Sequence, residues 1–355
     1  MSDTLHPLAA DLDHVLAHTS GIWDELRGAR LLVTGGTGFF GCWLLESFRW
    51  ACDRLGLAAS MTVLTRSPEA FRIKAPHLAE HRAIRLLRGD VRSFEYPAGR
   101  FSHAIHAASD ATPALCRERP LPVLDTLTEG TRHVLDSAVR AGVGRFLLCS
   151  SGAIYGAQPA DVKYLPETFA GGPDPGSVAS VYGEGKRVAE LLCALYAEAH
   201  GLACPIARGF AFVGPYLPLD AHFAIGNFLD DCMQGRPVRV AGDGTPVRSY
   251  LYAADLAVWL WTILVRGESG KPYNVGSERE VTIAETAAAV ASVLQSPWPV
   301  RVEGRTTPGA PVERYVPSTA RARSELNLEE RIPLREAIRR TAAAMRAPAA
   351  IGEQP

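Results

Sequence analysis

The chain has 355 residues, of which 47% are hydrophobic and 21% charged, and its formal net charge is −1. This composition is typical of a soluble globular protein with a large core in one to three domains. It argues against a nucleic-acid binder that relies on basic charge, and the lack of a run of 18 apolar residues predicts no membrane span.

The first 27 residues carry several acidic side chains and lack the apolar stretch of a secretory signal. Their apolar residues recur at helical spacing, which predicts an amphipathic helical extension over residues 1–27. We expect it to pack on the first domain or on a partner subunit. At the other end, residues 346–355 are rich in Ala and Pro and are predicted to form a flexible tail.

A glycine-rich turn follows the first predicted strand, residues 30–34, and precedes an apolar helix from residue 42 to residue 50. A ligand-free glycine turn would explain one glycine but not three at this spacing. Together they allow a tight turn, close approach of the backbone to a pyrophosphate, and close helix–strand packing. The amides at the helix start would hold the phosphates. The predicted dinucleotide contacts of this turn are Gly35, Gly38, Phe39, Phe40 and Gly41.

The second predicted strand, residues 61–65, ends at Arg66. An acidic residue at this place binds the ribose hydroxyls of NAD, whereas an Arg can accept the 2′-phosphate of NADP. Arg66 can equally stack on adenine, so NAD and NADP both stay open. A further strand, residues 104–108, ends in small residues that would let a cofactor pass.

The strand at residues 146–151 is apolar and ends in two serines. Because ligands of open parallel sheets bind outside the carboxyl ends of the strands, Ser151 is predicted to face the site. Its hydroxyl would then bond a substrate oxygen. The alternative is that Ser150 or Ser151 caps the next segment.

Tyr182 and Lys186 lie four residues apart in a helical segment, so their side chains share one face. An ammonium beside a phenol favours the phenolate, which can take a proton from a hydroxyl while a nicotinamide takes the hydride. The same spacing also occurs by chance as an exposed helical pair. Here it comes third in a series whose order and spacing both fit a dehydrogenase.

Together these residues resemble the extended short-chain dehydrogenase/reductase family that modifies nucleotide sugars, over roughly residues 28–340. The matching segments are Thr34 to Gly41, the triad Ser151, Tyr182 and Lys186, Arg208 to Pro215, and Tyr273 to Gly276. The resemblance implies a doubly wound parallel α/β sheet (Rossmann) with a smaller C-terminal substrate-binding lobe.

The same resemblance suggests the domain organisation. Residues 28–208 are predicted to form the dinucleotide-binding domain. Residues 209–345 form mainly the substrate lobe, with a return to the first domain near residues 250–265. Helices at about 123–142 and 183–200 would build a homodimer interface, as they do in the family.

Among the branches of this family, the chain looks most like UDP-glucuronate decarboxylase. Residues 107–113, 182–190 and 247–252 carry that likeness. It implies that tightly bound NAD oxidises C4 of UDP-glucuronate, followed by decarboxylation to UDP-4-keto-xylose or UDP-xylose, and that Lys186 also binds the nicotinamide ribose. The implied further cofactor contacts are Asp90, Val91, Ala107, Ala108 and Ser109. The implied substrate contacts are Ser109, Asp110, Ser151, Gly152, Ala153, Arg208, His222, Asn227, Arg248 and Tyr273.

The chain departs from that branch beside Ser151. Gly152 and Ala153 replace a segment that carries a Glu in the decarboxylases and an Asp-Glu pair in the 4,6-dehydratases. Dehydration is therefore disfavoured, and these small residues resemble the 4-epimerases. A UDP-sugar 4-epimerase stays open, as does an NADPH-dependent 4-keto sugar reductase, which Arg66 favours. A dinucleotide-sensing binding protein is the non-enzyme alternative, and the intact triad argues against it.

Cysteine and histidine usage completes these expectations. The seven cysteines are scattered and contain no Cys-x-x-Cys pair, which predicts reduced thiols and a cytoplasmic location. The ten histidines show no metal-ligand spacing, so no metal site is expected.

Overall fold

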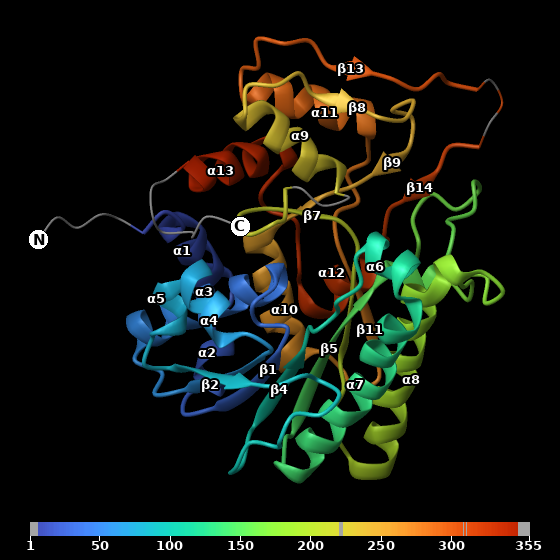
Figure 1. The fold of residues 1–355 in the computed structure, drawn as a ribbon. Coiled ribbons are helices and arrows are strands. Elements are labelled where there is room, and N and C mark those ends of the chain that lie inside the picture. The colour runs from blue at the N-terminus through green and yellow to red at the C-terminus, as the bar shows by residue number, and fades with distance from the viewer. Residues whose placement is uncertain (1–5, 220–222, 308, 310, 347–355) are drawn as a thin grey trace, which may run out of the picture.

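A seven-stranded parallel sheet forms the centre of the molecule in the computed structural model, which describes residues 6–219, 223–307, 309 and 311–346 (Figure 1). The strand order is β11-β6-β5-β4-β1-β2-β3, and each neighbouring pair is parallel. The predicted doubly wound α/β fold is therefore confirmed. The strands are β1 (Arg30–Thr34), β2 (Ser60–Thr65), β3 (Ile84–Arg88), β4 (His103–His106), β5 (Arg145–Ser151), β6 (Ile206–Gly209) and β11 (Pro272–Val275).

Side chains alternate between the two faces of this sheet, as the two-residue period of a strand requires. In β1, Leu31 and Val33 join one core cluster while Leu32 joins another. The first cluster includes α3 (Phe39–Leu55) and α10 (Ala253–Arg266), and the second includes α7 (Pro120–Arg140) and α8 (Val181–His200). Helices therefore cover both faces (Figure 1).

The helix predicted at residues 123–142 begins earlier, at Pro120. Pro is well tolerated at the first helical position because its missing N–H has no intrahelical partner there. Short helices α4 (Pro68–Lys74), α5 (Pro76–Ala79) and α6 (Pro113–Glu118) also begin with proline. Proline disfavours the interior of a helix, yet four helices of the described chain begin at a proline.

The C-terminal lobe is built from short strands and helices above the carboxyl edge of the sheet (Figure 1). β9 (Val247–Arg248) pairs with β12 (Val281–Thr282) and with β14 (Arg314–Tyr315), and β8 (Arg239–Val240) pairs with β13 (Arg301–Val302). The other elements beyond β6 are β7 (Phe212–Val213), β10 (Leu251–Tyr252), α9 (Ala224–Met233), α11 (Ile283–Val293), α12 (Ala320–Leu326) and α13 (Leu334–Arg346).

Helix α10 packs on the sheet domain, and every residue from Ala253 to Val265 is buried. The N-terminal helices α1 (Ala9–His18) and α2 (Ile22–Glu25) pack against it. The Tyr252 hydroxyl donates to Asp11 at 2.7 Å, and His14 lies 2.8 Å from Asp255. Both contacts fix the N-terminal extension to its own chain. The domain boundaries given above remain predictions.

No helix in the described ranges combines the length and apolar character that crossing a membrane would require.

Candidate active site

The predicted triad lies where β5 ends and α8 begins. Ser151 is the last residue of β5 and is followed by a 3-10 turn, η1 (Gly152–Tyr155). Another such turn, η2 (Val178–Ser180), leads into α8, which carries Tyr182 in its first turn. α8 packs on both β5 and η1. The structure therefore brings two segments about thirty residues apart to one place at the carboxyl edge of the sheet.

Lys186 is 3% exposed and points back across β5. Its Nζ donates to the carbonyl oxygen of Cys149 at 2.8 Å and lies 5.9 Å from the centroid of the Tyr182 ring. A buried ammonium beside a partly exposed phenol is the arrangement that the four-residue spacing predicts. Here, the strand carbonyl holds the ammonium in place.

Ser151 is buried, and its Oγ accepts a hydrogen bond from the amide of Ala153 at 3.1 Å. It thus caps the 3-10 turn, as the alternative interpretation proposed. Capping uses one lone pair of the hydroxyl, and its proton stays available to a neighbouring oxygen. The two interpretations of Ser151 are therefore compatible.

The glycine turn forms a backbone cradle. A Cβ at Gly35 would lie 2.4 Å from the carbonyl carbon of Ala107, and one at Gly41 would lie 2.3 Å from the carbonyl oxygen of Gly35. The φ of Gly35 is +71°, which glycine adopts readily. The Lys74 ammonium donates to the Thr37 carbonyl at 3.0 Å and holds the turn from outside. Only glycine fits at positions 35 and 41, so the turn is shaped to approach a dinucleotide closely.

Arg66 lies at the carboxyl end of β2 and forms an ion pair with Asp110, 2.8 Å away. A residue predicted to bind cofactor and one predicted to bind substrate are thus in direct contact. Both side chains are substantially exposed. Asp90 lies after β3 and accepts from the Arg92 guanidinium at 2.8 Å, which helps to hold the pKa of Asp90 below its usual range. Neither arrangement distinguishes NAD from NADP.

A family model described as the NAD dependent epimerase/dehydratase family matches residues 31–276. The chain belongs to this family. It is 31% identical over 311 residues to UDP-glucuronic acid decarboxylase 1 of Arabidopsis thaliana, covering 88% of this chain and 68% of that protein. The resemblance inferred from the motifs is confirmed, and with it the assignment as an enzyme of the nucleotide-sugar-modifying type.

Solved structures of this family have the same fold. UDP-glucose 4-epimerase of Thermotoga maritima, solved with UDP-glucose, has a TM-score of 0.76 at 21% identity, with coverage of 89% of this chain and 98% of that one. The dTDP-glucose 4,6-dehydratase DesIV of Streptomyces venezuelae, solved with NAD bound, has a TM-score of 0.75 at 24% identity, with coverage of 89% and 97%.

Two predicted substrate contacts have partners within the protein. The Arg208 guanidinium is directed at Glu190 on α8, 2.7 Å away, and it also donates to the Tyr155 hydroxyl and the Glu167 carbonyl. Tyr273 is the second residue of β11, and its hydroxyl accepts from the amide of Glu268, before that strand begins. Ligands of parallel sheets bind at the opposite, carboxyl end. These contacts give Arg208 and Tyr273 structural roles, and their contact with substrate stays a prediction.

Arg208 belongs to a buried polar network that sequence reasoning missed. Glu190 also accepts from the Ser150 hydroxyl at 2.5 Å, and the Tyr155 hydroxyl donates to Asn274 at 2.7 Å. The network joins β5, β6 and β11 to α8, the helix that carries Tyr182. Glu190 lies one helical turn after Lys186, and this spacing is the only local signal that pointed to it.

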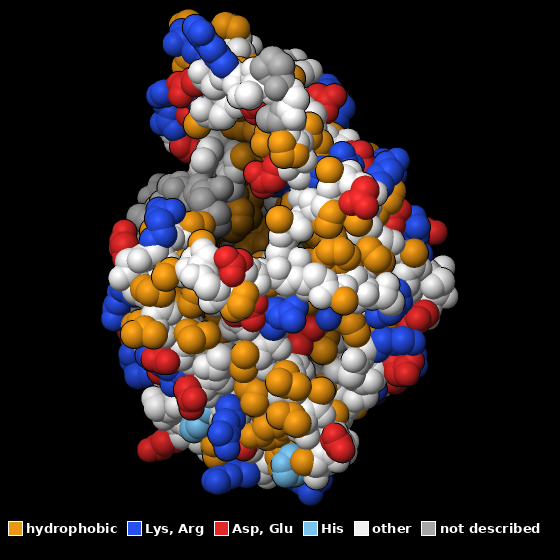
Figure 2. Space-filling model, turned by 90° about the vertical axis from the view of Figure 1, so that its right-hand side faces the viewer, with side chains coloured by type: hydrophobic (Ala, Val, Ile, Leu, Met, Phe, Trp, Pro, Cys, Tyr) orange, Lys and Arg blue, Asp and Glu red, His pale blue; other side chains and the backbone are white. Residues whose placement is uncertain are grey.

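The other predicted substrate residues lie on the C-terminal lobe. Arg248 is on β9, where its guanidinium bonds the exposed carboxylate of Glu313 at 2.5 Å. Asn227 is exposed on α9. Figure 2 shows the surface hollowed between this lobe and the sheet domain. His222 lies outside the described residues. The roles of Arg248 and Asn227 remain predictions.

A second tyrosine enters the site from the same lobe. Tyr315 is on β14, in register with Arg248 on β9. Its hydroxyl lies against Gly152, next to Ser151, and its phenol interacts electrostatically with Ser151 and Tyr182. No motif spacing indicates this residue, because the fold alone brings the last part of the chain to the triad.

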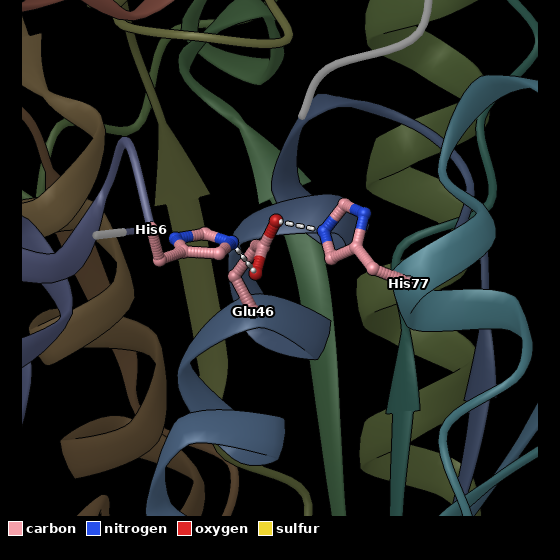
Figure 3. Close-up of side chains that lie close together, drawn as sticks. All are labelled: His6, Glu46 and His77. Carbon is pink, nitrogen blue, oxygen red and sulfur yellow. Dashed lines mark hydrogen bonds and ion pairs between the residues drawn. The ribbon is translucent and has the colours of Figure 1, made fainter. Parts of the chain in front are cut away.

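Another polar cluster lies away from the triad and surrounds Glu46, a residue of α3 (Figure 3). His77 lies 2.7 Å and His6 3.6 Å from the Glu46 carboxylate. Tyr216 donates to that carboxylate at 2.5 Å, and the Arg49 guanidinium is 3.5 Å away. Burial favours a raised pKa for Glu46, but the His77 hydrogen bond and charge outweigh it and lower the pKa.

Three potential ligands for a cation thus lie within 4.8 Å of one another. However, the Leu8 amide donates to Nδ1 of His6, so the neutral ring carries its proton on Nε2, facing Glu46. A cation would also lie beside the Arg49 guanidinium. The Arg49 guanidinium and the protonated Nε2 therefore favour a polar cluster around Glu46, in which His77 and Tyr216 are hydrogen-bonded and His6 is only in contact, over a metal centre.

Proposed function

We propose that this enzyme oxidises C4 of UDP-glucuronate with bound NAD and then decarboxylates it, giving UDP-4-keto-xylose, UDP-xylose or both. The observation that carries the proposal is the juxtaposition of Ser151, Tyr182 and Lys186 beside the glycine cradle. A family member that is 31% identical to this chain is a UDP-glucuronic acid decarboxylase by name, and this supports the choice of substrate.

The side chains divide the first step among them. Tyr182 removes the proton of the 4-hydroxyl, and Lys186 places its ammonium beside the Tyr182 ring. The Ser151 hydroxyl donates a hydrogen bond to the 4-oxygen. This bond keeps the 4-oxygen in line with Tyr182. When bound, NAD supplies the acceptor for the hydride of C4.

The second step needs little from the protein. Once C4 is a carbonyl, the carboxylate at C6 belongs to a β-keto acid. The electron pair of the C5–C6 bond moves toward the C4 carbonyl as carbon dioxide leaves, and C5 then takes a proton. The absence of an acidic side chain at Gly152 and Ala153 is therefore compatible with this reaction.

Mass spectrometry of UDP-glucuronate incubated with the purified protein and NAD tests the proposal. We expect loss of carbon dioxide, and the product mass distinguishes the 4-keto pentose from UDP-xylose. Unchanged UDP-glucuronate would contradict it.

A UDP-sugar 4-epimerase is the second candidate. Gly152 and Ala153 are the observation that favours it, because epimerisation at C4 needs no second acid or base. NMR of the same incubation would show a C4 epimer of unchanged mass. An NADPH-dependent 4-keto sugar reductase is favoured by Arg66 at the end of β2. Comparing dissociation constants for NAD and NADP, in wild type and Arg66→Ala, tests that alternative.

We also infer a homodimer that forms through α7 and α8, and a cytoplasmic location. Figure 2 views this side of the molecule and shows hydrophobic side chains gathered on it. Leu121 on α7 is 71% exposed, and Leu191 on α8 is 59% exposed. All seven cysteines are free thiols, which suits a reducing compartment. A Leu191→Glu variant is expected to run as a monomer in light scattering, and a wild type that is itself monomeric would contradict the dimer.

A further inference from the structure

The space beside Ser151 is occupied by a side chain from the far end of the sequence. A Cβ built on Gly152 would lie 2.7 Å from the hydroxyl oxygen of Tyr315 and 2.8 Å from Cζ of Phe210. Both distances are well below a normal contact. The missing side chain at Gly152 therefore makes room for the phenol of Tyr315.

The ring of Tyr315 is held from behind. Its centroid lies 4.7 Å from that of Phe210, with an angle of 32° between the planes. β14 pairs with β9, which fixes the backbone of Tyr315 beside Arg248. With ring and backbone both fixed, the hydroxyl is held against Gly152, where it interacts with the neighbouring Ser151. Rigid support of this kind is what a group acting on substrate requires.

The two phenols of the site have different surroundings. Tyr182 lies beside the Lys186 ammonium. Tyr315 is half-buried, and the desolvation of its hydroxyl raises its pKa above the ordinary value for tyrosine. Tyr315 therefore stays protonated at neutral pH and is a proton donor. Neighbouring groups with contrasting surroundings commonly divide acid and base roles.

We propose that Tyr315 donates the proton that C5 receives after carbon dioxide has left, in the place of an acidic side chain at position 152 or 153. The step rests on the decarboxylation proposed above. Loss of carbon dioxide leaves an enolate across C4 and C5. Its electron pair forms the new C5–H bond with the Tyr315 proton, and the C4 carbonyl is restored.

The placement of the Ser151 hydroxyl beside Tyr315 provides a route that closes the proton balance. Tyr182 holds the proton taken from the 4-hydroxyl. Passed through the Ser151 hydroxyl, that proton reprotonates the phenolate left on Tyr315. The proton that leaves O4 thus balances the one that reaches C5, and the steps as far as UDP-4-keto-xylose consume no outside acid. Reduction of the ketone to UDP-xylose takes one further proton from solvent.

Tyr315→Phe tests the step, because it removes the hydroxyl and keeps the ring on Phe210. In single turnovers with UDP-glucuronate, the rate of C4 oxidation can be measured from the absorbance of the reduced nicotinamide. We expect this rate to stay within about twofold of the wild-type rate. Formation of the protonated product should fall by roughly 100-fold or more, as for loss of a general acid. Tyr96→Phe, which removes a phenol hydroxyl bonded to His133 away from the site, should change neither rate.

A labelling experiment adds an independent readout. In deuterated water the wild type should place deuterium in one of the two C5 positions of the product, and Tyr315→Phe should lose that preference. Gly152→Ala keeps the hydroxyl but displaces it, so the same defect is expected, and this variant serves if Tyr315→Phe fails to fold.

Three results would overturn the inference. Wild-type product formation by Tyr315→Phe would exclude a role as proton donor. An equal loss of C4 oxidation and product formation would show that Tyr315 only positions Ser151. A wild type that releases no carbon dioxide would overturn the proposed function itself, and with it this step.

Discussion

The two halves of the carboxyl edge are built by different means. At β1 and β2 the edge is shaped by backbone, since Gly35 and Gly41 leave no room for a Cβ. At β5 and α8 it is shaped by side chains, with Ser151, Tyr182 and Lys186 directed at one place. The first half is suited to holding a ligand closely, and the second is suited to moving protons.

The two halves also depend on different support. The glycine turn is held by contacts within a short stretch and by the neighbouring end of β4. The side-chain half depends on the buried network of Glu190 and Arg208, which joins α8 to three strands. Damage to each half should therefore leave a different signature, and the following variants, from the largest expected effect to the smallest, test that separation.

Tyr182→Phe should abolish chemistry and spare cofactor binding. Loss of the phenol removes the base for C4 oxidation, and we expect turnover to fall by roughly 100- to 10,000-fold. The dissociation constant for NAD should change little. Tyr164 also lies beside a lysine, Lys163, but on a loop away from the triad, so Tyr164→Phe is a matched control. Loss of NAD binding in Tyr182→Phe would contradict the separation.

Arg208→Met should destabilise the side-chain half. It leaves the carboxylate of Glu190, 12% exposed, without its charged partner. Breaking one side of such a pair costs about 3–5 kcal/mol of the free energy of unfolding. Urea unfolding measures this loss, with the exposed pair Arg239–Glu303 as a control through Arg239→Met. Equal effects of the two substitutions would show that the buried network gives no special support.

Gly41→Ala should damage the backbone half. Its Cβ would lie 2.3 Å from Cα of Gly36, so α3 cannot approach the turn. Overpacking of this kind costs about 1–3 kcal/mol, and we expect weaker NAD binding in calorimetric titration. Gly242→Ala is the control, because a Cβ there meets nothing within 4 Å. Unchanged NAD affinity in Gly41→Ala would show that the cradle does not hold the dinucleotide.

His106 lies between the two halves, 2.6 Å from the Thr34 hydroxyl and 3.1 Å from that of Thr131. Burial lowers the pKa of His106 from 6.5 to about 3. As the pH falls, His106 is protonated in the unfolded chain before it is protonated in the folded protein. The contribution of neutral His106 to stability is therefore complete above pH 6.5 and is lost as the pH falls toward 3.

His106→Gln should therefore lose less stability than wild type between pH 7 and about pH 5. Urea unfolding at both values checks this, with the exposed His200→Gln as a control. Parallel losses in wild type and His106→Gln would show that His106 does not titrate in this way.

The backbone half was predictable from sequence because its determinants are local. The glycines between the strand and the helix allow a tight turn that larger residues could not form, so motif and structure agree. Tyr182 and Lys186 were found for the same reason, since four residues place them on one helix face. The fold class followed from the family resemblance, because the motifs that carry it are short and local.

The remainder of the site depends on tertiary contacts. Tyr315 reaches Ser151 only because β14 pairs with β9. Arg208 and Tyr273 lie in segments that matched the family, but a segment match does not reveal which end of a strand a side chain approaches. Their partners, Glu190 and the amide of Glu268, decide this, and neither contact follows from spacing.

The most direct test of the account is a single turnover with UDP-glucuronate deuterated at C4. The proposed mechanism predicts that deuterium reaches the nicotinamide, with a primary isotope effect on the rise of reduced-cofactor absorbance, and that Tyr182→Phe shows no such rise. Carbon dioxide release with no deuterium in the cofactor at any time would contradict C4 oxidation as the first step and, with it, the role assigned to the Ser151, Tyr182 and Lys186 triad.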